Sequence, residues 1–284
     1  MAFWCFFRGL FRGLLRCFSQ GVLLGVIFLS FAAQAAPDRV TITGSSTIAP
    51  LASELARAFE KKMGPDRVRI DVQTGGSSRG LSDALNGRSD IGMVSRHMSP
   101  TGKLQVFPVA RDGIGLIVHK DNPLSSLTKK QLKDIYLGKT TNWRQVGGPD
   151  LDIVVVHKAA GRSTQELFLG FLGLKNRQIK ASVIVGDNQQ GIKTVSGIRG
   201  AVGYVSIGSA ASAAQSSQSL KVLAMDGIAA TQQNVRSGTY PLLRILNFVT
   251  HGDPQGFPKG FLAFSQSKEA NKVIEKQSFV PMGG

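Results

Sequence analysis

The chain has 284 residues, of which 34 are Lys or Arg, 18 are Asp or Glu and only 2 are Cys. Aromatic residues make up 7 % of the chain, and the basic residues are scattered instead of clustered, which argues against the basic tracts and stacking platforms of a nucleic-acid-binding protein. A chain of this length can bury a sizeable core without the help of disulfides.

The N-terminus has the pattern of an export signal. Three arginines without any acidic residue precede an apolar run over 21–33, which is short for a membrane span. Ala33-Gln34-Ala35 then supplies the small residues that signal peptidase accepts. We therefore predict a signal peptide over residues 1–36, cleaved near Ala35 or Ala36, and a periplasmic location. A membrane anchor is the alternative for the same segment.

Removal of this segment changes the charge and the cysteine content of the chain. Cys5 and Cys17 both lie within it, so the mature protein, about 248 residues long, folds without cysteine. No cysteine lies at the cleavage point to carry a lipid anchor. Loss of three arginines leaves 31 basic residues against 18 acidic ones, a net charge of +13. Such a charge favours an anionic ligand or partner.

From Val40 onward, short β-branched runs alternate with helical periods, as βα units require. Thr128 to Gln131 has the spacing of a capping box, and the Ser/Ala/Gln stretch over 209–219 is typical of a loop. The pattern predicts an α/β protein with two lobes and parallel-rich sheets. The predicted strands are 40–43, 68–72, 91–94, 106–118 with an interruption at Asp112-Gly113, 153–156, 183–185, 201–205, 221–224 and 242–249; the predicted helices follow Thr47, Ser78, Thr128 and Thr164, and two more surround Phe261 and Val273.

Three turns place glycine beside serine or threonine where a strand gives way to a helix. They are Gly44-Ser45-Ser46-Thr47, Gly75-Gly76-Ser77-Ser78 and Gly161-Arg162-Ser163-Thr164. Glycine allows close backbone approach, hydroxyls donate hydrogen bonds, and the free N–H groups of a helix start carry partial positive charge. In open α/β sheets such turns meet beyond the carboxyl ends of the strands. We therefore expect one shared anion site.

The same residue types also have a purely structural reading. Ser163-Thr164-Gln165-Glu166 has capping-box spacing that any helix can use, and Thr47 and Ser77 are open to the same objection. The four histidines show no metal-ligand spacing, and no serine has a convincing His-Asp pair. We therefore predict no catalytic residue, no metal and no cofactor.

Short motifs in one order from Val40 to Met282 resemble those of a known family. Singly each is weak, but the sequence of motifs is similar to that of the phosphate-binding proteins of bacterial ABC-type phosphate importers. The motifs are Gly44-Ser45-Ser46-Thr47, Gly76-Ser77-Ser78, Asp90-Ile91-Gly92, Ser95-Arg96, Asp112-Gly113-Ile114, Asp121-Asn122-Pro123-Leu124, Leu127-Thr128, Thr141-Asn142-Trp143, Gly200-Ala201-Val202-Gly203-Tyr204-Val205 and Phe279-Val280-Pro281.

The resemblance implies a two-lobed periplasmic binding protein of type II, a venus-flytrap whose hinge consists of two crossover segments near 112–118 and 240–247. Lobe one would comprise 37–113, completed by 245–284, and lobe two 114–244. Such a protein is not an enzyme. It would bind inorganic phosphate or a similar oxyanion between its lobes as a monomer, and closure around the ligand would present it to the membrane permease of an ABC importer.

The resemblance also implies which residues bind the ligand. Three of them depart from the common family pattern: Arg96 stands where some relatives have Asp, Lys158 stands where Arg is common, and Arg162 replaces a serine. These departures make the expected site more cationic. The full expected set is Ser46, Thr47, the backbone N–H of Ile48, Ser77, Ser95, Arg96, Lys158, Arg162, Ser163 and Thr164.

Several alternatives stay open at this point. With Arg96 in place of Asp, the carboxylate that accepts the proton of phosphate and repels sulfate is missing, unless serine or backbone acceptors, or another carboxylate such as Asp83 or Asp187, replace it. A receptor for sulfate, tungstate or molybdate is therefore the nearest alternative. A secreted phosphohydrolase and a basic interaction module are more distant ones. Arg162 either clamps the anion or points to solvent.

Overall fold

A computed structural model describes residues 36–216 and 219–282. The residues from Pro37 onward form one compact unit. Apart from Ala36, the predicted signal peptide lies outside the described residues and stays a prediction. Within the described part of the chain, no helix is both long enough and apolar enough to cross a membrane.

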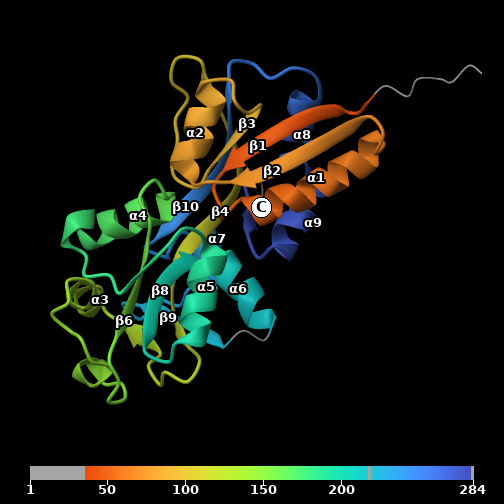
Figure 1. The fold of residues 1–284 in the computed structure, drawn as a ribbon. Helices are drawn as coiled ribbons and strands as arrows, with labels where there is room; N and C mark the ends of the chain where they lie inside the picture. The colour runs from red at the N-terminus through yellow and green to blue at the C-terminus, as the bar shows by residue number, and fades with distance from the viewer. Residues whose placement is uncertain (1–35, 217–218, 283–284) are drawn as a thin grey trace, which may run out of the picture. The chain divides into compact units, whose positions relative to one another are not determined.

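The first part of the chain alternates strands and helices (Figure 1). Val40 and Ile42 alternate as buried positions of the first strand, and the first helix buries Leu51, Leu55 and Phe59 at helical spacing. A proline in its first turn suits the start of that helix. The elements are β1 (Asp38–Gly44), α1 (Ala49–Met63), β2 (Val68–Thr74), α2 (Ser77–Leu85), β3 (Ile91–Val94) and β4 (Leu104–His119).

The middle of the chain repeats the alternation. Thr128 and Gln131 form the predicted capping box at the start of α3, which confirms that prediction. The elements are β5 (Ser126–Leu127), α3 (Lys129–Tyr136), η1 (Trp143–Val146), β6 (Val154–Lys158), α4 (Ser163–Leu172), η2 (Asn176–Gln178), β7 (Val183–Val185), α5 (Asn188–Gly197), β8 (Ala201–Ser206), α6 (Ile207–Gln215), β9 (Leu220–Met225) and α7 (Gln232–Arg236).

The last part contributes one long strand and the two predicted C-terminal helices. These elements are β10 (Leu243–His251), α8 (Gly256–Ser265), α9 (Lys268–Lys276) and β11 (Val280–Pro281). Strand β10 lies antiparallel between β3 and β4, so the end of the chain completes the sheet that its beginning started. Figure 1 shows this return, with β10 beside β3 and β4.

The strands are hydrogen-bonded in the order β2-β1-β3-β10-β4-β8-β6-β7. Pairs β1·β2, β1·β3, β6·β8 and β6·β7 are parallel, whereas β4 and β10 pair with their neighbours in antiparallel fashion. The sheets are therefore mixed and not simply parallel. Up to Gly113, β4 pairs with β10, and from Ile114 it pairs with β8 and β9, so one strand serves both halves of the molecule.

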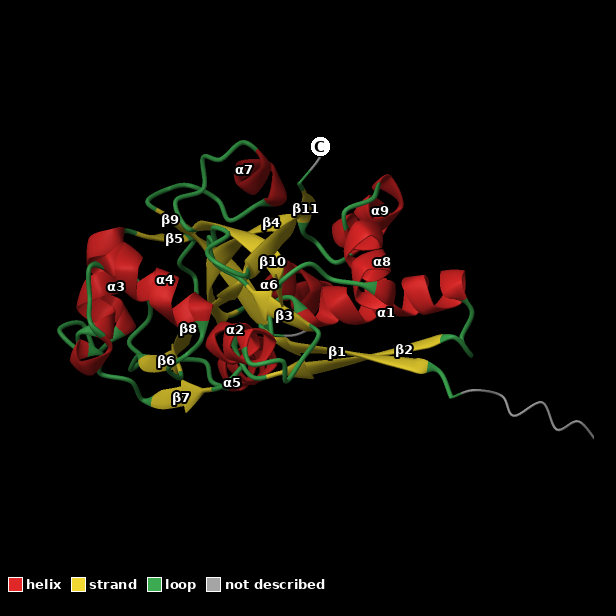
Figure 2. Ribbon diagram, turned by 90° about the horizontal axis from the view of Figure 1, so that it is seen from above, coloured by secondary structure: helices red, strands yellow, loops and turns green. Residues whose placement is uncertain are grey.

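Separate apolar cores underlie the two halves. One core packs α1, α8 and α9 against β1, β3 and β10, and Phe59, Phe248 and Phe261 are among its buried side chains. Others pack α3, α4 and α5 against β6, β8 and β9. Figure 2 shows α3 and α4 on one side of β4 and β10, and α1, α8 and α9 on the other. The predicted two-lobed α/β fold is confirmed, while the predicted lobe limits at 113/114 and 244/245 stay predictions.

Two sequence-based expectations were wrong. Asp112-Gly113 does not interrupt the strand, because β4 runs continuously over 16 residues. Residues 209–215 of the stretch expected to be a loop are helical, because α6 occupies Ile207–Gln215. The cap of this helix is Ser206, whose hydroxyl accepts a hydrogen bond from the Ser209 amide. Alanine-rich composition has high helix propensity, which outweighed the serines and glutamine that suggested a loop.

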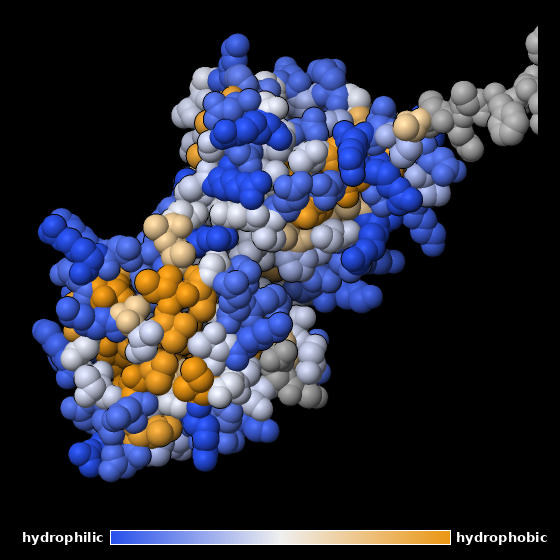
Figure 3. Space-filling model, viewed as in Figure 1, coloured by the Kyte–Doolittle hydropathy of each residue, from blue (hydrophilic) through white to orange (hydrophobic). Residues whose placement is uncertain are grey.

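One face of the half of the molecule that contains β6 and β8 carries a group of apolar side chains. Figure 3 shows them gathered on the face where β6, β8 and α3 lie in Figure 1. Ile184 of β7, a strand at the end of the sheet, is 68 % exposed. Single exposed apolar residues of this kind are common on soluble proteins, and this one lies on the edge away from β4.

Candidate anion-binding site

The three glycine and hydroxyl turns all lead from a strand into a helix, as the sequence predicted. Thr47 lies in the turn between β1 and α1, Ser77 is the first residue of α2, and Ser163 is the first residue of α4. The capping-box reading of Ser163 was wrong. Arg162 precedes the helix as its cap residue, and no side chain caps α4.

In the first half of the molecule, hydroxyls from separate elements meet. Ser45 donates to the Oγ of Ser95 at 2.9 Å, and the Oγ of Ser77 lies 3.3 Å from the same atom. The backbone N–H of Ser95 donates to Ser77 Oγ at 3.1 Å. Ser46 is half-buried in the turn. The backbone N–H of Ile48 donates to the carbonyl of Ser45, so in this structure the turn itself uses that donor.

Arg244, at the start of β10, connects the turns of the two halves. Its Nη2 donates to Thr47 Oγ1 at 3.1 Å, and its Nη1 donates to Thr164 Oγ1 at 2.8 Å. Asp112 of β4 accepts from Nε at 3.0 Å and from Nη2 at 2.7 Å. Both charged side chains are buried. A well-paired guanidinium therefore holds two of the predicted hydroxyls in place.

The hydrogen bonds that the hydroxyls of Thr47 and Thr164 accept orient these two hydroxyls. Thr47 Oγ1 accepts from Arg244 and also from Asn188 Nδ2 at 3.1 Å. Within residues 36–216 and 219–282, neither threonine hydroxyl donates a hydrogen bond. A hydroxyl has one donor hydrogen beside its acceptor lone pairs, so both hydrogens are free for an acceptor that comes from outside the chain.

Ser163 has the most unusual environment of the predicted residues. Its side chain is 1 % exposed, and its Oγ has no hydrogen-bond partner among the described residues. Buried hydroxyls are almost always hydrogen-bonded in native proteins, because leaving one unpaired is destabilising. Its position at the first turn of α4, beside Thr164, adds the helix N–H groups to the same neighbourhood.

Lys158, the last residue of β6, brings a buried cation toward the same residues. It is 2 % exposed, and its Nζ donates to the carbonyl of Asp187 at 2.6 Å and to Asn188 Oδ1 at 3.0 Å. The pKa of Lys158 is lowered from its ordinary value to about 7, and burial is the largest cause. The positive charges of Arg244 and Arg162 also lower this pKa, whereas the carboxylate of Asp187 raises it. A bound anion would restore the charged form.

Arg162 lies against the turn from the other half. A side chain at Gly76 would meet Arg162 Cδ and the carbonyl of Gly161, each at 2.8 Å, so the two turns are in close contact. Within the described residues, the Arg162 guanidinium forms no hydrogen bond and no ion pair. Its contact with the Gly76 turn favours a role in clamping the anion over an orientation toward solvent. The clamping role of Arg162 stays a prediction.

Arg96 is placed differently from the other predicted cations. Its guanidinium forms an ion pair with Glu166 of α4, a carboxylate that also accepts a weak hydrogen bond from Ser78 Oγ at 3.5 Å. The backbone N–H of Ser78 donates to the carbonyl of Gly161 at 3.3 Å. Arg96 therefore joins the two halves of the molecule through a protein carboxylate, and its contact with ligand stays a prediction.

Sequence reasoning did not find Arg244, Asp112 or Asn188 as members of the site. Asp112 had attracted notice as a possible break in a strand, as part of a family motif and as the start of a hinge segment, but not as a site residue. Arg244 and Asn188 lie in stretches without any glycine and hydroxyl turn. The carboxylates suggested as acceptors have hydrogen-bond partners within the chain. Asp83 bonds to Arg79 and Arg88, and the side chain of Asp187 caps α5.

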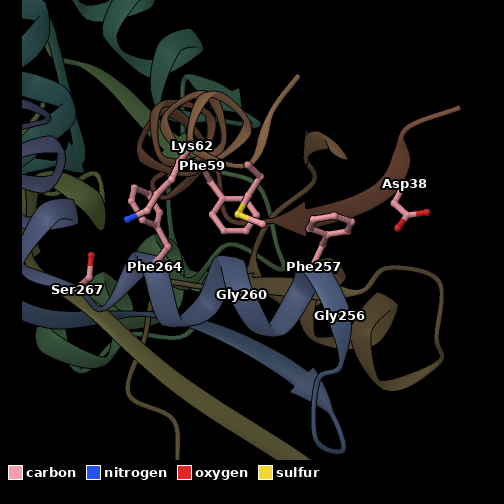
Figure 4. A pocket seen from close by; sticks show the side chains of 9 residues that line it. Asp38, Phe59, Lys62, Gly256, Phe257, Gly260, Phe264 and Ser267 are labelled. Atoms are coloured by element: carbon pink, nitrogen blue, oxygen red, sulfur yellow. The ribbon is translucent and has the colours of Figure 1, made fainter. Parts of the chain in front are cut away.

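Outside the anion-binding site, the described residues form a pocket but no cluster of metal ligands. No group of three or more His, Cys, Asp or Glu among them is arranged to hold a metal ion. A pocket of about 560 Å³ lies between α1 and α8 (Figure 4). It is lined mainly by apolar groups, among them Phe59, Phe257 and Phe264, and contains none of the predicted site residues.

Comparison with known proteins identifies the family of this chain. The sequence matches the family described as PBP superfamily domain over residues 32–269. It is 28 % identical over 253 residues to the phosphate-binding protein PstS of Bacillus subtilis, a match that covers 87 % of this chain and 82 % of that protein. That relative is named as a binding protein and not as an enzyme.

Two solved structures are similar to the chain in both fold and sequence. A phosphate ABC transporter substrate-binding protein from Clostridium perfringens, with bound phosphate, is 33 % identical, with a TM-score of 0.78 over 86 % of this chain and 100 % of that one. An ABC-type phosphate transport receptor from Vibrio cholerae is 32 % identical, with a TM-score of 0.68 over 85 % and 99 %.

Two lobes that share long strands, with hydroxyls and cations from both lobes brought together, define a two-lobed solute-binding protein. The chain belongs to the PBP superfamily and, within it, to the substrate-binding proteins of ABC-type phosphate transporters.

Proposed function

We propose that this protein is a periplasmic receptor that binds inorganic phosphate between its two lobes and delivers it to the membrane permease of an ABC importer. The observation that carries the proposal is the buried Oγ of Ser163, which has no partner within the described residues. The relative from Clostridium perfringens, which is named for phosphate transport and contains phosphate, supports the choice of ligand.

The chemistry of the neighbouring groups fits a tetrahedral oxyanion. Thr47 and Thr164 accept hydrogen bonds from Arg244 and keep their own hydrogens for an outside acceptor. Lys158 and Arg162 add positive charge. Donors of this kind bind an anion without any reactive group, so capture needs no chemical step. Turnover of a phosphomonoester by the purified protein in the presence of divalent metal would contradict this part of the proposal.

Selection of phosphate over sulfate needs a group that accepts the proton of phosphate. Asp112 uses both carboxylate oxygens, one for Arg244 and the other for the Gly208 amide at 3.3 Å. The hydroxyl of Ser163 can accept as well as donate, so it can receive the O–H of monoprotonated phosphate. Sulfate offers no such hydrogen. We therefore propose phosphate as the preferred ligand over sulfate, tungstate or molybdate.

Titration calorimetry with phosphate and with sulfate tests the proposal. Protein refolded from denaturant in phosphate-free buffer should bind phosphate at micromolar concentration or below, and sulfate much more weakly. Ser163→Ala should weaken phosphate binding about 10- to 100-fold, the loss of a hydrogen bond to a charged group. Ser196→Ala is the matched control, because the Oγ of Ser196 in α5 also lacks a partner among the described residues. The absence of micromolar phosphate binding would overturn the proposal.

Export of the protein and its oligomeric state belong to the same proposal. We propose that a signal peptide is removed near Ala35 or Ala36 and that the mature protein is a monomer in the periplasm. N-terminal sequencing of the protein recovered from the periplasm measures the cleavage point directly. Sedimentation of the mature protein with and without phosphate measures its oligomeric state.

A further inference from the structure

Lys158 is a buried lysine whose ammonium group has neutral partners only. Its Nζ donates to a backbone carbonyl, that of Asp187, and to the amide oxygen of Asn188. Within the described residues, no ion pair involves Lys158. A buried cation is usually paired with an opposite charge, because burial removes its hydration. The charge of Lys158 is therefore poorly compensated by the protein's own groups.

The groups that face Lys158 come from several elements. Arg244 approaches from β10 and Arg162 from the start of α4, and both disfavour the charged amine by lowering its pKa. Asp187, before α5, favours it, but the carboxylate of Asp187 is held by the Gln190 amide at 2.8 Å. Tyr204 of β8 accepts from the Lys158 backbone N–H at 3.2 Å, and its hydroxyl lies 3.0 Å from Nδ1 of His157. Burial lowers the pKa of His157, which disfavours its charged form.

A short hydrogen-bond path connects Lys158 to the proposed phosphate site. Asn188 accepts from Lys158 through Oδ1 and donates through Nδ2 to Thr47 Oγ1 at 3.1 Å. Thr47 in turn accepts from Arg244. Lys158 therefore lies one side chain away from a hydroxyl that is expected to hold the anion. At this distance a doubly charged anion strongly favours the ammonium form over the amine.

We propose that Lys158 takes up a proton from solution when phosphate binds, so that the affinity for phosphate depends on the ionisation of this one side chain near neutral pH. The lone pair of Nζ binds the proton, and Lys–NH2, HPO4²⁻ and H⁺ give Lys–NH3⁺ beside HPO4²⁻. The inference rests on the proposed function, because phosphate is the anion that drives the uptake. An arginine at this position would stay charged throughout and take up nothing.

Calorimetry in buffers of different ionisation enthalpy counts the protons that accompany phosphate binding. With a pKa of about 7 in the free protein, Lys158 should take up about 0.9 proton at pH 8 and about 0.1 at pH 6. Lys158→Arg should take up close to none at pH 8. Lys193→Arg, an exposed lysine of α5, is the matched control and should behave as the unaltered protein does.

The same proteins give a second readout. Between pH 6 and pH 8, the dissociation constant of the unaltered protein should rise about tenfold relative to that of Lys158→Arg, because the free amine must first be protonated. Taking this ratio cancels the titration of phosphate itself. If Lys158→Arg does not fold, the ¹³Cε resonance of Lys158 in the unaltered protein replaces it; the resonance should titrate near neutrality without phosphate and stay in its charged form at pH 8 with phosphate.

Each outcome has a definite meaning. Phosphate binding without proton uptake at pH 8, or equal uptake by the unaltered protein and Lys158→Arg, overturns the inference and leaves the proposed function standing. The second of these results would mean that the ligand, bound as H2PO4⁻, carries the proton. A protein that does not bind phosphate at any pH overturns both.

Discussion

Arg244 donates two hydrogen bonds to one oxygen of Asp112, at 3.0 and 2.7 Å, although the two residues lie 132 positions apart in the chain. Their side chains are 0 % and 1 % exposed. Asp112 lies in β4, next to the point where the partners of this strand change from β10 to β8 and β9, and Arg244 lies near the start of β10. This ion pair therefore lies where the lobes join and holds the guanidinium that orients Thr47 and Thr164.

Asp112→Asn should strongly destabilise the protein, because it leaves the buried guanidinium of Arg244 without a counter-charge. We expect the free energy of unfolding to fall by about 3–5 kcal/mol, measured by urea denaturation followed by circular dichroism in phosphate-free buffer. Asp150→Asn is the control, since Asp150 pairs with Arg144 on the surface, where the side chains are 68 % and 67 % exposed. It should change stability by at most about 1 kcal/mol. Equal effects of the two variants would contradict this reading of the pair.

Arg96 and Glu166 should act on phosphate binding as a unit. Arg96→Ala should weaken binding about two- to fivefold, because the partly exposed pair with Glu166 links the lobes in this structure. In a double-mutant cycle measured by calorimetry, Arg96→Ala should have little further effect once Glu166→Ala is present. If instead the full effect of Arg96→Ala persists in the Glu166→Ala background, Arg96 contacts phosphate directly, as the family resemblance implies.

Gly76→Ala should weaken phosphate binding because it pushes the lobes apart. A methyl group at this position would meet the carbonyl of Gly161 and the side chain of Arg162, each at 2.8 Å, and the backbone has a φ of +95°. Gly87→Ala is the matched control at the other end of α2, where φ is +66° and nothing lies within 4 Å of the added carbon. Gly87→Ala should lose roughly 1 kcal/mol of stability through backbone strain. Gly76→Ala should lose more, because a φ of 95° with a ψ of 160° is a conformation that is essentially restricted to glycine, and only Gly76→Ala should lose affinity. An unchanged affinity for Gly76→Ala would show that the close approach of the two turns is not needed for binding.

The stability of the ligand-free protein should depend on pH through Lys158. The pKa of this lysine is about 7 in the folded protein against an ordinary value of 10.5, so between these values the unfolded chain binds more protons. Unfolding free energy therefore rises with pH across this window, by at most about 1.4 kcal/mol per pH unit, and the gain is complete above the ordinary value. Measured by urea denaturation from pH 7 to pH 9, the unaltered protein should gain stability relative to Lys158→Met. The exposed Lys193→Met should track the unaltered protein, and a constant difference for Lys158→Met would contradict the prediction.

The local elements of the site were predictable because their signals are short-range. Gly44, Gly76 and Gly161 all have positive φ in the structure, a conformation that glycine adopts without strain. The strand before each turn and the helix after it follow from residue periodicity. The missed helix α6 shows the limit of that approach, since serine and alanine in one stretch satisfy both a loop and a helix.

The partners within the site were not predictable from these signals. Arg96 was expected beside the ligand, and its partnership with Glu166 depends on α4 facing β3 across the junction. Ser163 resembled a helix cap in sequence, and only the three-dimensional arrangement shows its hydroxyl buried and, among the described residues, unpaired. Capping depends on a few neighbouring residues, whereas burial and pairing depend on contacts with distant parts of the chain.

The sequence alone therefore determined the alternating α/β elements, the three anion-suited turns and the family resemblance, because each depends on the order and spacing of neighbouring residues. The tertiary structure decided that Arg244, paired with Asp112, holds hydroxyls from two of those turns. It also decided that Lys158 is buried with neutral hydrogen-bond partners, which lowers its pKa to about 7. Desolvation and long-range pairing arise only when distant segments pack together, so the spacing of residues along the chain does not predict them.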